Sequence, residues 1–108
     1  MADLIKDNIH FIILLQSPGT SKDQKNMLIK TISKGQLKAL SEIAYNTLQG
    51  SIDLNADDKR RLKRYAHSLR ILGDRRSTIT ERREALSPGL ISTLLSTVLH
   101  YIKAIISQ

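Results

Sequence analysis

The residues of this chain best suited to bind a charged partner are its lysines and arginines. Ten of the seventeen bases lie between positions 59 and 83, where only Asp74 and Glu81 oppose them, so this segment has a net charge of +8. The whole chain carries +7, so all other residues together contribute −1. Charge concentrated in this way predicts a partner with many negative charges, above all nucleic acid. The predicted nucleic-acid-binding residues are Lys59, Arg60, Arg61, Lys63, Arg64, Arg70, Arg75, Arg76, Arg82 and Arg83.

A solvent-exposed helix face is the ordinary alternative to a binding surface, and such a face usually mixes positive and negative charges. Here the mixture is strongly uneven, which favours a polyanion, while an acidic protein or an anionic lipid stays open as the partner. If this segment forms one helix, five side chains should project together, with Lys59 and Arg61 broadening the patch. These five are Arg60, Lys63, Arg64, His67 and Arg70.

Contacts to backbone phosphates, rather than to base edges, are predicted for the basic segment. Its helix offers no cluster of amide side chains to pair with adenine. Stacking on single strands needs aromatic rings, and the whole chain has one Phe and three Tyr. Binding is therefore expected to be largely independent of sequence and strongly dependent on salt. DNA is the expected partner, although RNA fits the same residues, and a helix-turn-helix of residues 36–49 and 55–72 is a further alternative.

Residues arranged for catalysis or for holding a metal are not evident in the sequence. His10, His67 and His100 fall on three different predicted helices, with no His pair at helical spacing. The sequence has no glycine-rich phosphate loop and no nucleophile elbow, and the absence of cysteine removes thiolate nucleophiles and Cys-ligated zinc. The chain is therefore predicted to be non-enzymatic, with no metal and no cofactor.

The elements that position the basic segment are predicted to be helices, because no alternating strand pattern of useful length occurs. With 108 residues, 41% hydrophobic and 25% charged, the composition is that of one small folded domain, 1–108. We predict an all-α fold, a compact bundle of five or six short helices with a basic central helix and an amphipathic C-terminal helix. The predicted helices span 3–16, 21–32, 36–49, 55–72, 78–86 and 88–106. The lower number holds if residues 21–49 form one helix bent near Gly35, and two helices are preferred.

Several predicted helix starts are marked by residues that can satisfy unpaired backbone N–H groups. Capping boxes are expected at Ser21 with Gln24, Ser33 with Gln36, and Thr78 with Glu81. Asn55 is a predicted N-cap, and Asp57 and Asp58 behind it complement the positive end of the helix dipole. Gly50 is expected to end the preceding helix in the left-handed conformation.

The central helix carries a narrow apolar seam among its bases. Leu62, Tyr65, Leu69 and Leu72 recur at spacings of three, four and three, and Gly73 then ends the pattern. The seam predicts that this helix docks on the rest of the chain. The bases are therefore expected to project from a rigid frame rather than from a tail.

The last predicted helix begins with Ser87 as N-cap and Pro88 in the first turn. Its aliphatic residues recur by four and three, as a core or oligomerisation seam requires, and this packing is the favoured interpretation. Its uncharged Ser/Thr face also permits insertion into a membrane interface. The candidate membrane or oligomer interface comprises Leu90, Ile91, Leu94, Leu95, Val98, Leu99, Ile102 and Ile105. Residues 88–108 are a candidate detachable helix, and two apolar end helices predict a homo-oligomer.

Four features of the middle of the chain carry a family resemblance. They are the helix start Gln36–Leu40, the connector Gly50–Leu54, a Lys-Arg-x-Leu-Lys-Arg-Tyr run at residues 59–65 and the Leu-Arg-x-Leu of Leu69–Leu72. Together, residues 33–86 resemble short basic proteins encoded by adintoviruses, Polinton-like elements and other adenovirus-related DNA viruses. The resemblance implies a virion-associated protein comparable to the adenovirus core protein X, which condenses packaged DNA.

The same resemblance implies a second kind of role, that of a minor capsid component acting on membranes. The alternative function is therefore a minor capsid or membrane-active interaction protein that uses the apolar helices at 4–15 and 90–106. Capsid protein and a membrane surface are then possible partners, and the expected location is the virion or the nucleus of an infected cell, and otherwise intracellular. In this chain Asp74, Glu81 and Glu84 lie among the distal arginines, which favours a folded adaptor between genome and capsid.

Overall fold

The computed structural model describes residues 2–107, and within them the chain forms nine α-helices and no strand. The predicted all-α fold is confirmed. The predicted number of five or six helices is wrong, because three of the six predicted helices are each divided in two. The radius of gyration of the Cα atoms is 12.7 Å and the extents are 31 × 30 × 25 Å, which describes a compact globule.

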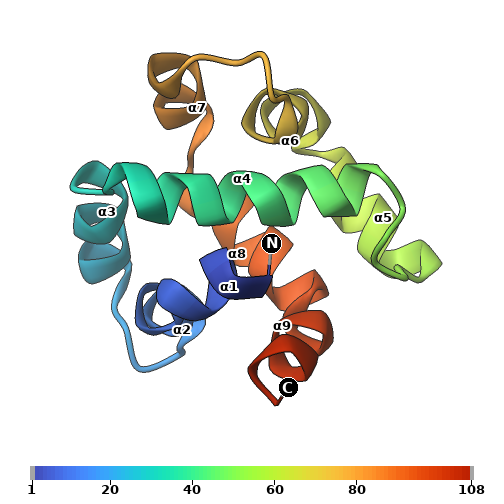
Figure 1. The fold of residues 1–108 in the computed structure, drawn as a ribbon, viewed down its shortest axis with the longest axis horizontal. Coiled ribbons are helices and arrows are strands. Elements are labelled where there is room, and N and C mark those ends of the chain that lie inside the picture. The colour runs from blue at the N-terminus through green and yellow to red at the C-terminus, as the bar shows by residue number, and fades with distance from the viewer. Residues whose placement is uncertain (1, 108) are drawn as a thin grey trace.

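Figure 1 shows α4, the longest helix, crossing the middle of the molecule, with α6 and α7 on one side and α1, α2 and α9 on the other. Helix α8 contacts α2, α3, α5 and α9, so it lies at the centre of the packing. The helices are α1 (Ala2–Asp7), α2 (Ile9–Gln16), α3 (Lys22–Lys30), α4 (Lys34–Leu48), α5 (Ala56–Lys63), α6 (Ala66–Gly73), α7 (Ile79–Ala85), α8 (Pro88–Thr97) and α9 (Leu99–Ile106).

The three divided helices break at Asn8, Tyr65 and Val98, none of which is a proline or a glycine. Each of these residues has φ between −115° and −108° and ψ between 12° and 20°, outside the α-helical range. At two breaks the turn tightens, since the N–H of Asn8 donates to the carbonyl of Ile5 (3.1 Å) and that of Tyr65 to Leu62 (2.9 Å). The apolar spacing continues across each break and only the direction changes, by 64° between α8 and α9.

The predicted helix starts are confirmed by their side-chain hydrogen bonds. The four capping side chains accept from the backbone N–H three residues later at 2.8–3.1 Å, and the side chain there accepts in return. These capping residues are Ser21, Ser33, Asn55 and Thr78. Ser87 Oγ likewise accepts from the N–H of Leu90 (3.1 Å), and Gly50 has φ of +77°, the predicted left-handed ending. Two helices, α3 and α4, replace the alternative of one bent helix.

Gly73 ends α6 as predicted, but its main role is to let α6 lie close to α4. A Cβ atom at this position would lie 2.9 Å from Cδ1 of Leu48 and 3.0 Å from the backbone nitrogen of Tyr45. Leu69 and Leu72 of α6 are buried against the same core that holds Leu40, Ile43 and Ala44 of α4. The close approach therefore fixes α6, the second half of the basic segment, on α4.

The aliphatic stripe of the predicted C-terminal helix forms the centre of the core. Of the eight residues predicted as a membrane or oligomer interface, all but Leu99 are at most 4% exposed and Leu99 is half-buried, while Ile106 at the end of the helix is 45% exposed. In this structure they pack internally, so a membrane or oligomer interface built from them requires α8 and α9 to leave the core. No single helix among residues 2–107 has the length and apolarity to span a membrane, whereas the bent pair α8 and α9 meets both criteria together.

Candidate nucleic-acid interface

The basic segment is held by α5 and α6, whose seam docks on the core as predicted. Leu62, Leu69 and Leu72 are at most 5% exposed, and Tyr65 is half-buried. The first turn of α5 is fixed by Asn55, whose Oδ1 accepts from the N–H of Asp58 at 2.8 Å. The side chains around this seam therefore project from a frame anchored at both ends.

The bases of the α5–α6 segment line two separate hollows. Of the five side chains expected to project together, Arg60 and Arg64 line one hollow, and Lys63 and Arg70 line the other. One hollow, here called the α5–α8 pocket, has a volume of about 330 Å³ and is lined by Arg60, Arg61, Arg64, Tyr65 and Thr93. The other, here called the α4–α6 groove, has a volume of about 400 Å³, with Lys59, Lys63 and Arg70 among its lining residues. Its apolar lining comes from Leu48, Leu54, Leu62, Ala66 and Leu69.

Four of the bases on this frame are exposed and keep their charge unpaired. Among the described residues 2–107, none of the four makes a hydrogen bond, an ion pair or a ring contact. They are Lys59, Lys63, Arg64 and Arg70. Their ammonium and guanidinium groups are available to an outside anion without breaking any contact of the fold.

Two further bases on α5 make contacts that an incoming anion can replace at little cost. Arg60 forms an ion pair with Asp57, and the two side chains are 77% and 71% exposed, so solvent screens the pair strongly. Arg61 donates from Nη2 to the hydroxyl of Ser96 on α8 at 2.9 Å. Both guanidinium groups retain further N–H donors.

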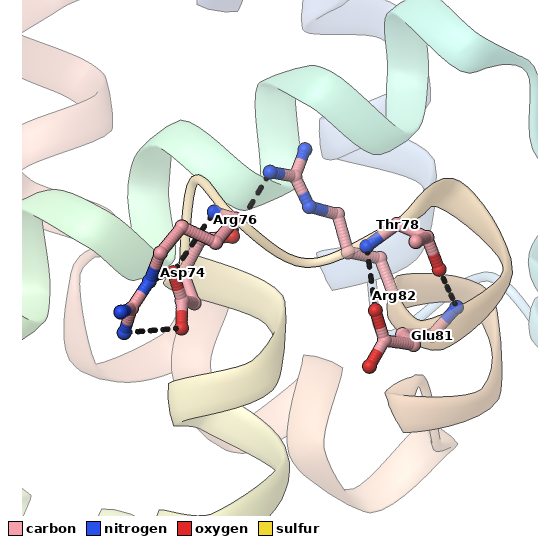
Figure 2. A network of polar contacts seen from close by, with 5 residues as sticks. All are labelled: Asp74, Arg76, Thr78, Glu81 and Arg82. Carbon is pink, nitrogen blue, oxygen red and sulfur yellow. Dashed lines mark hydrogen bonds and ion pairs between the residues drawn. The ribbon is translucent and has the colours of Figure 1, made fainter.

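The loop between α6 and α7 uses its arginines to hold itself together (Figure 2). Asp74 accepts from the N–H of Arg76 at 2.9 Å and from its guanidinium at 3.2 and 3.3 Å. The side-chain hydrogen bond from Arg76, followed by the backbone one, lowers the pKa of Asp74 below its ordinary value of 3.8. Figure 2 also shows Arg82 reaching back to this loop, where its Nη2 donates to the carbonyl oxygen of Asp74 at 3.0 Å.

The remaining two predicted site arginines also support the fold. The guanidinium of Arg75 lies 4.3 Å from the centroid of the Tyr45 ring and 3.7 Å from Glu42, which ties the loop to α4. Arg83 donates from Nη1 to the carbonyl oxygen of Ile32 at 2.7 Å, across 51 residues of chain. The ten predicted residues thus divide into six on the α5–α6 frame and four that connect the loop and α7 to the rest of the molecule.

Tyr65 and Thr93 line the α5–α8 pocket and were not among the predicted site residues. Tyr65 follows directly after the basic run, and a partly buried tyrosine places its hydroxyl near polar groups, a signal available in the sequence. Thr93 comes from α8, 28 positions further along the chain, and its place in the pocket depends on tertiary packing alone.

Metal ligands are not grouped in this structure: across residues 2–107 no cluster of three or more His, Cys, Asp or Glu side chains is arranged to hold an ion.

Comparisons with protein-family models, with curated protein sequences and with solved structures give no match. The resemblance to short basic virion proteins therefore stays a prediction.

Proposed function

We propose that this protein binds nucleic acid through backbone phosphates, largely independently of base sequence, using the bases that α5 and α6 present. The observation that carries the proposal is the contrast within the basic segment. Lys59, Lys63 and the two exposed arginines Arg64 and Arg70 are unpaired on a docked frame, whereas the arginines beyond Asp74 contact the protein itself. A protein that needed charge only for solubility would not require this separation.

The chemistry of these side chains favours phosphates over base edges. Lysine ammonium groups and exposed arginines neutralise phosphates and release counterions, which gives affinity without sequence selection. Residues 56–73 contain neither Asn nor Gln, the side chains that pair with adenine. We therefore propose DNA packaging or genome attachment, without catalysis, as the function, in keeping with the resemblance to virion core proteins.

The resemblance also supports a setting for this activity. The protein would act in a virion or in the nucleus of an infected cell, where several copies together coat DNA. A homo-oligomer suits that task, since each copy contributes few phosphate contacts. The acids among the distal arginines favour a folded adaptor over a purely condensing tail.

Salt-titrated binding to several unrelated duplexes tests the proposal. Neutralising four to six phosphates predicts a slope of log affinity against log salt between about −3.6 and −5.4. Affinities for unrelated sequences should agree within about threefold, because phosphate contacts carry little sequence information. Absence of binding at low salt would overturn the proposal, and a strong preference for one duplex would favour the helix-turn-helix alternative.

A second candidate function, that of an interaction protein binding capsid protein or another copy of itself, is favoured by an apolar surface on α2 and α3. Ile13, Leu14 and Met27 are 48%, 46% and 60% exposed. Leu14 and Met27 line a hollow of about 420 Å³ together with Leu28. Large exposed side chains grouped in this way are typical of a protein contact. In its membrane-active form this candidate needs α8 and α9 to open, and release of dye from neutral liposomes by the whole protein tests that form.

A further inference from the structure

We propose that the α5–α8 pocket is a discrete site for one phosphate group of the bound nucleic acid. This inference rests on the proposed function and makes it more specific. Most exposed bases would form a diffuse charged surface, whereas this pocket would fix one phosphate in a defined position.

The composition of the pocket matches an oxyanion. Its five lining residues include three arginines, Arg60, Arg61 and Arg64, and no acid. Among residues 2–107, the one ion pair made by these arginines is the exposed one between Arg60 and Asp57. Guanidinium groups present a planar fork of donors that matches phosphate oxygens two at a time. Three such groups around one concave space favour a ligand with several acceptor oxygens over a single carboxylate.

The residues that line the pocket also carry donors that no group among residues 2–107 accepts from. Among residues 2–107, the guanidinium of Arg64 and the side-chain hydroxyls of Tyr65 and Thr93 have no hydrogen-bond partner. Arg61 donates one hydrogen bond to Ser96, and its guanidinium has further N–H donors. A tetrahedral phosphate accepts several hydrogen bonds at once, so one ligand could satisfy the arginine and both hydroxyls.

Gly89 allows the pocket to take this shape. A Cβ atom on Gly89 would meet the hydroxyl oxygen of Tyr65 and lie 3.0 Å from its Cζ, so only glycine lets the ring lie against α8. The break between α5 and α6 falls at Tyr65 itself, whose ring lies close to Gly89 in the first turn of α8. Tyr65 and the three arginines therefore line one pocket, with Thr93 of α8.

The α4–α6 groove provides a matched comparison within the same helix. Lys63 and Arg64 are neighbours, both exposed and both unpaired, yet Lys63 lines the groove and Arg64 lines the pocket. The groove has an apolar lining and offers point charges at its edge. Loss of Lys63 should therefore remove a nonspecific electrostatic attraction to the nucleic acid. Loss of Arg64 should remove a bidentate hydrogen-bonded contact to one phosphate.

Duplex binding by substituted full-length protein tests the pocket. Arg64→Ala should weaken binding about tenfold and Lys63→Ala about twofold to threefold, while each flattens the salt slope by about 1. Arg64→Lys should keep the wild-type salt slope but lower the affinity, because lysine keeps the positive charge and lacks the planar guanidinium that donates two hydrogen bonds to a phosphate. Tyr65→Phe, checked for an unchanged melting temperature, should lose about threefold. Equal losses for Arg64→Ala and Lys63→Ala, with Arg64→Lys equal to wild type, would overturn the site.

Inorganic phosphate, titrated into isotopically labelled protein at constant ionic strength against chloride, gives an independent reading. Saturable NMR shifts are expected at Arg61, Arg64 and Thr93, with little change at Lys59 or Lys63. Uniform, non-saturating shifts would overturn the pocket even if duplex binding persists. Saturation by phosphate without any duplex binding would support the pocket and overturn the proposed function. Tighter binding to vesicles containing phosphatidic acid than to duplex, lost in Arg64→Lys, would overturn nucleic acid as the source of the phosphate.

Discussion

Arginine serves two purposes in this chain, and the contacts of each side chain separate them. Arg64 and Arg70 are exposed and have no partner among residues 2–107, while Arg82 and Arg83 donate to backbone carbonyl oxygens of Asp74 and Ile32. Composition alone cannot make this distinction, because the acceptors are backbone groups that every residue possesses. The two kinds of arginine should therefore respond differently to substitution.

Removing an arginine that contacts the rest of the protein should lower the free energy of unfolding and leave duplex binding unchanged. Arg83→Ala deletes a partly buried, charged hydrogen bond to Ile32, and we expect a loss of about 1–2 kcal/mol in the free energy of unfolding. Lys63→Ala, at an exposed position without partners, should change stability by less than about 0.5 kcal/mol. Urea unfolding measures both. An Arg83→Ala protein as stable as wild type but deficient in duplex binding would place Arg83 in the interface instead.

Asp74 gives the loop after α6 a predictable response to acid. The hydrogen bonds from Arg76 lower the pKa of Asp74 in the folded protein, so its stabilising contribution is present above the ordinary value of 3.8. That contribution is lost as the pH falls from 3.8 through the lowered pKa. Asp74→Asn should therefore flatten the decline of stability below about pH 4 relative to the exposed control Asp53→Asn. Parallel declines in urea unfolding from pH 6 to pH 2 for both variants would contradict this role.

At the level of elements, the sequence predicts where helices begin far better than where they bend. The caps at Ser33, Asn55 and Thr78 are local, since the side chain and the N–H it accepts from are three residues apart. The breaks at Tyr65 and Val98 have no such local signal. The apolar spacing passes through them unchanged, and the new direction is set by the helices on which each half packs. The bases expected on one helix face accordingly line two separate hollows.

Gly73 shows how a contact between elements overrides helix propensity. Gly73→Ala would place a methyl group against the side chain of Leu48 and the backbone of α4, so we expect a loss of about 1–3 kcal/mol in stability. Gly35→Ala is the matched control, because its Cβ would lie no closer than 3.8 Å to Asn8 and helix propensity favours alanine. Thermal unfolding should show a lower melting temperature for Gly73→Ala and no decrease for Gly35→Ala. A stabilised Gly73→Ala protein would mean that α6 and α4 are further apart.

In the molecule as a whole, the apolar surface of α2 and α3 is formed by a different part of the chain from the basic α5–α6 frame, and its exposed side chains are apolar rather than charged. Leu14→Glu should weaken any self-association that this surface supports, because it places a charge among exposed apolar side chains. Ile79→Glu, at a position 41% exposed on α7, is the control. Sedimentation across a concentration series measures both. Equal effects of the two substitutions would remove this surface as the oligomer contact.

The position of the exposed basic cluster along the chain follows from the sequence, and which of its bases stay unpaired does not. Charge counting placed it between Lys59 and Arg83, because net charge is a sum over residues and needs no structure. The choice of which bases stay free depends on the partners that tertiary packing supplies, as Glu42 and Tyr45 do for Arg75. The favoured interpretation of the 88–106 stripe as a packing seam agrees with the burial of Leu90, Ile91, Leu94, Leu95, Val98, Ile102 and Ile105, whereas Leu99 is half-buried and Ile106 is 45% exposed.

The proposed nucleic-acid binding depends on where the bases lie and not on the total charge of the protein. Two variants, each reducing the net charge from +7 to +3, test it directly by the salt dependence of duplex binding. One replaces by alanine the unpaired bases Lys59, Lys63, Arg64 and Arg70, and the other replaces the exposed lysines Lys22, Lys30, Lys34 and Lys38. We predict that the first flattens the salt slope by about 3 to 4 and the second by less than about 1. Equal losses of slope and affinity in the two variants would contradict the claim.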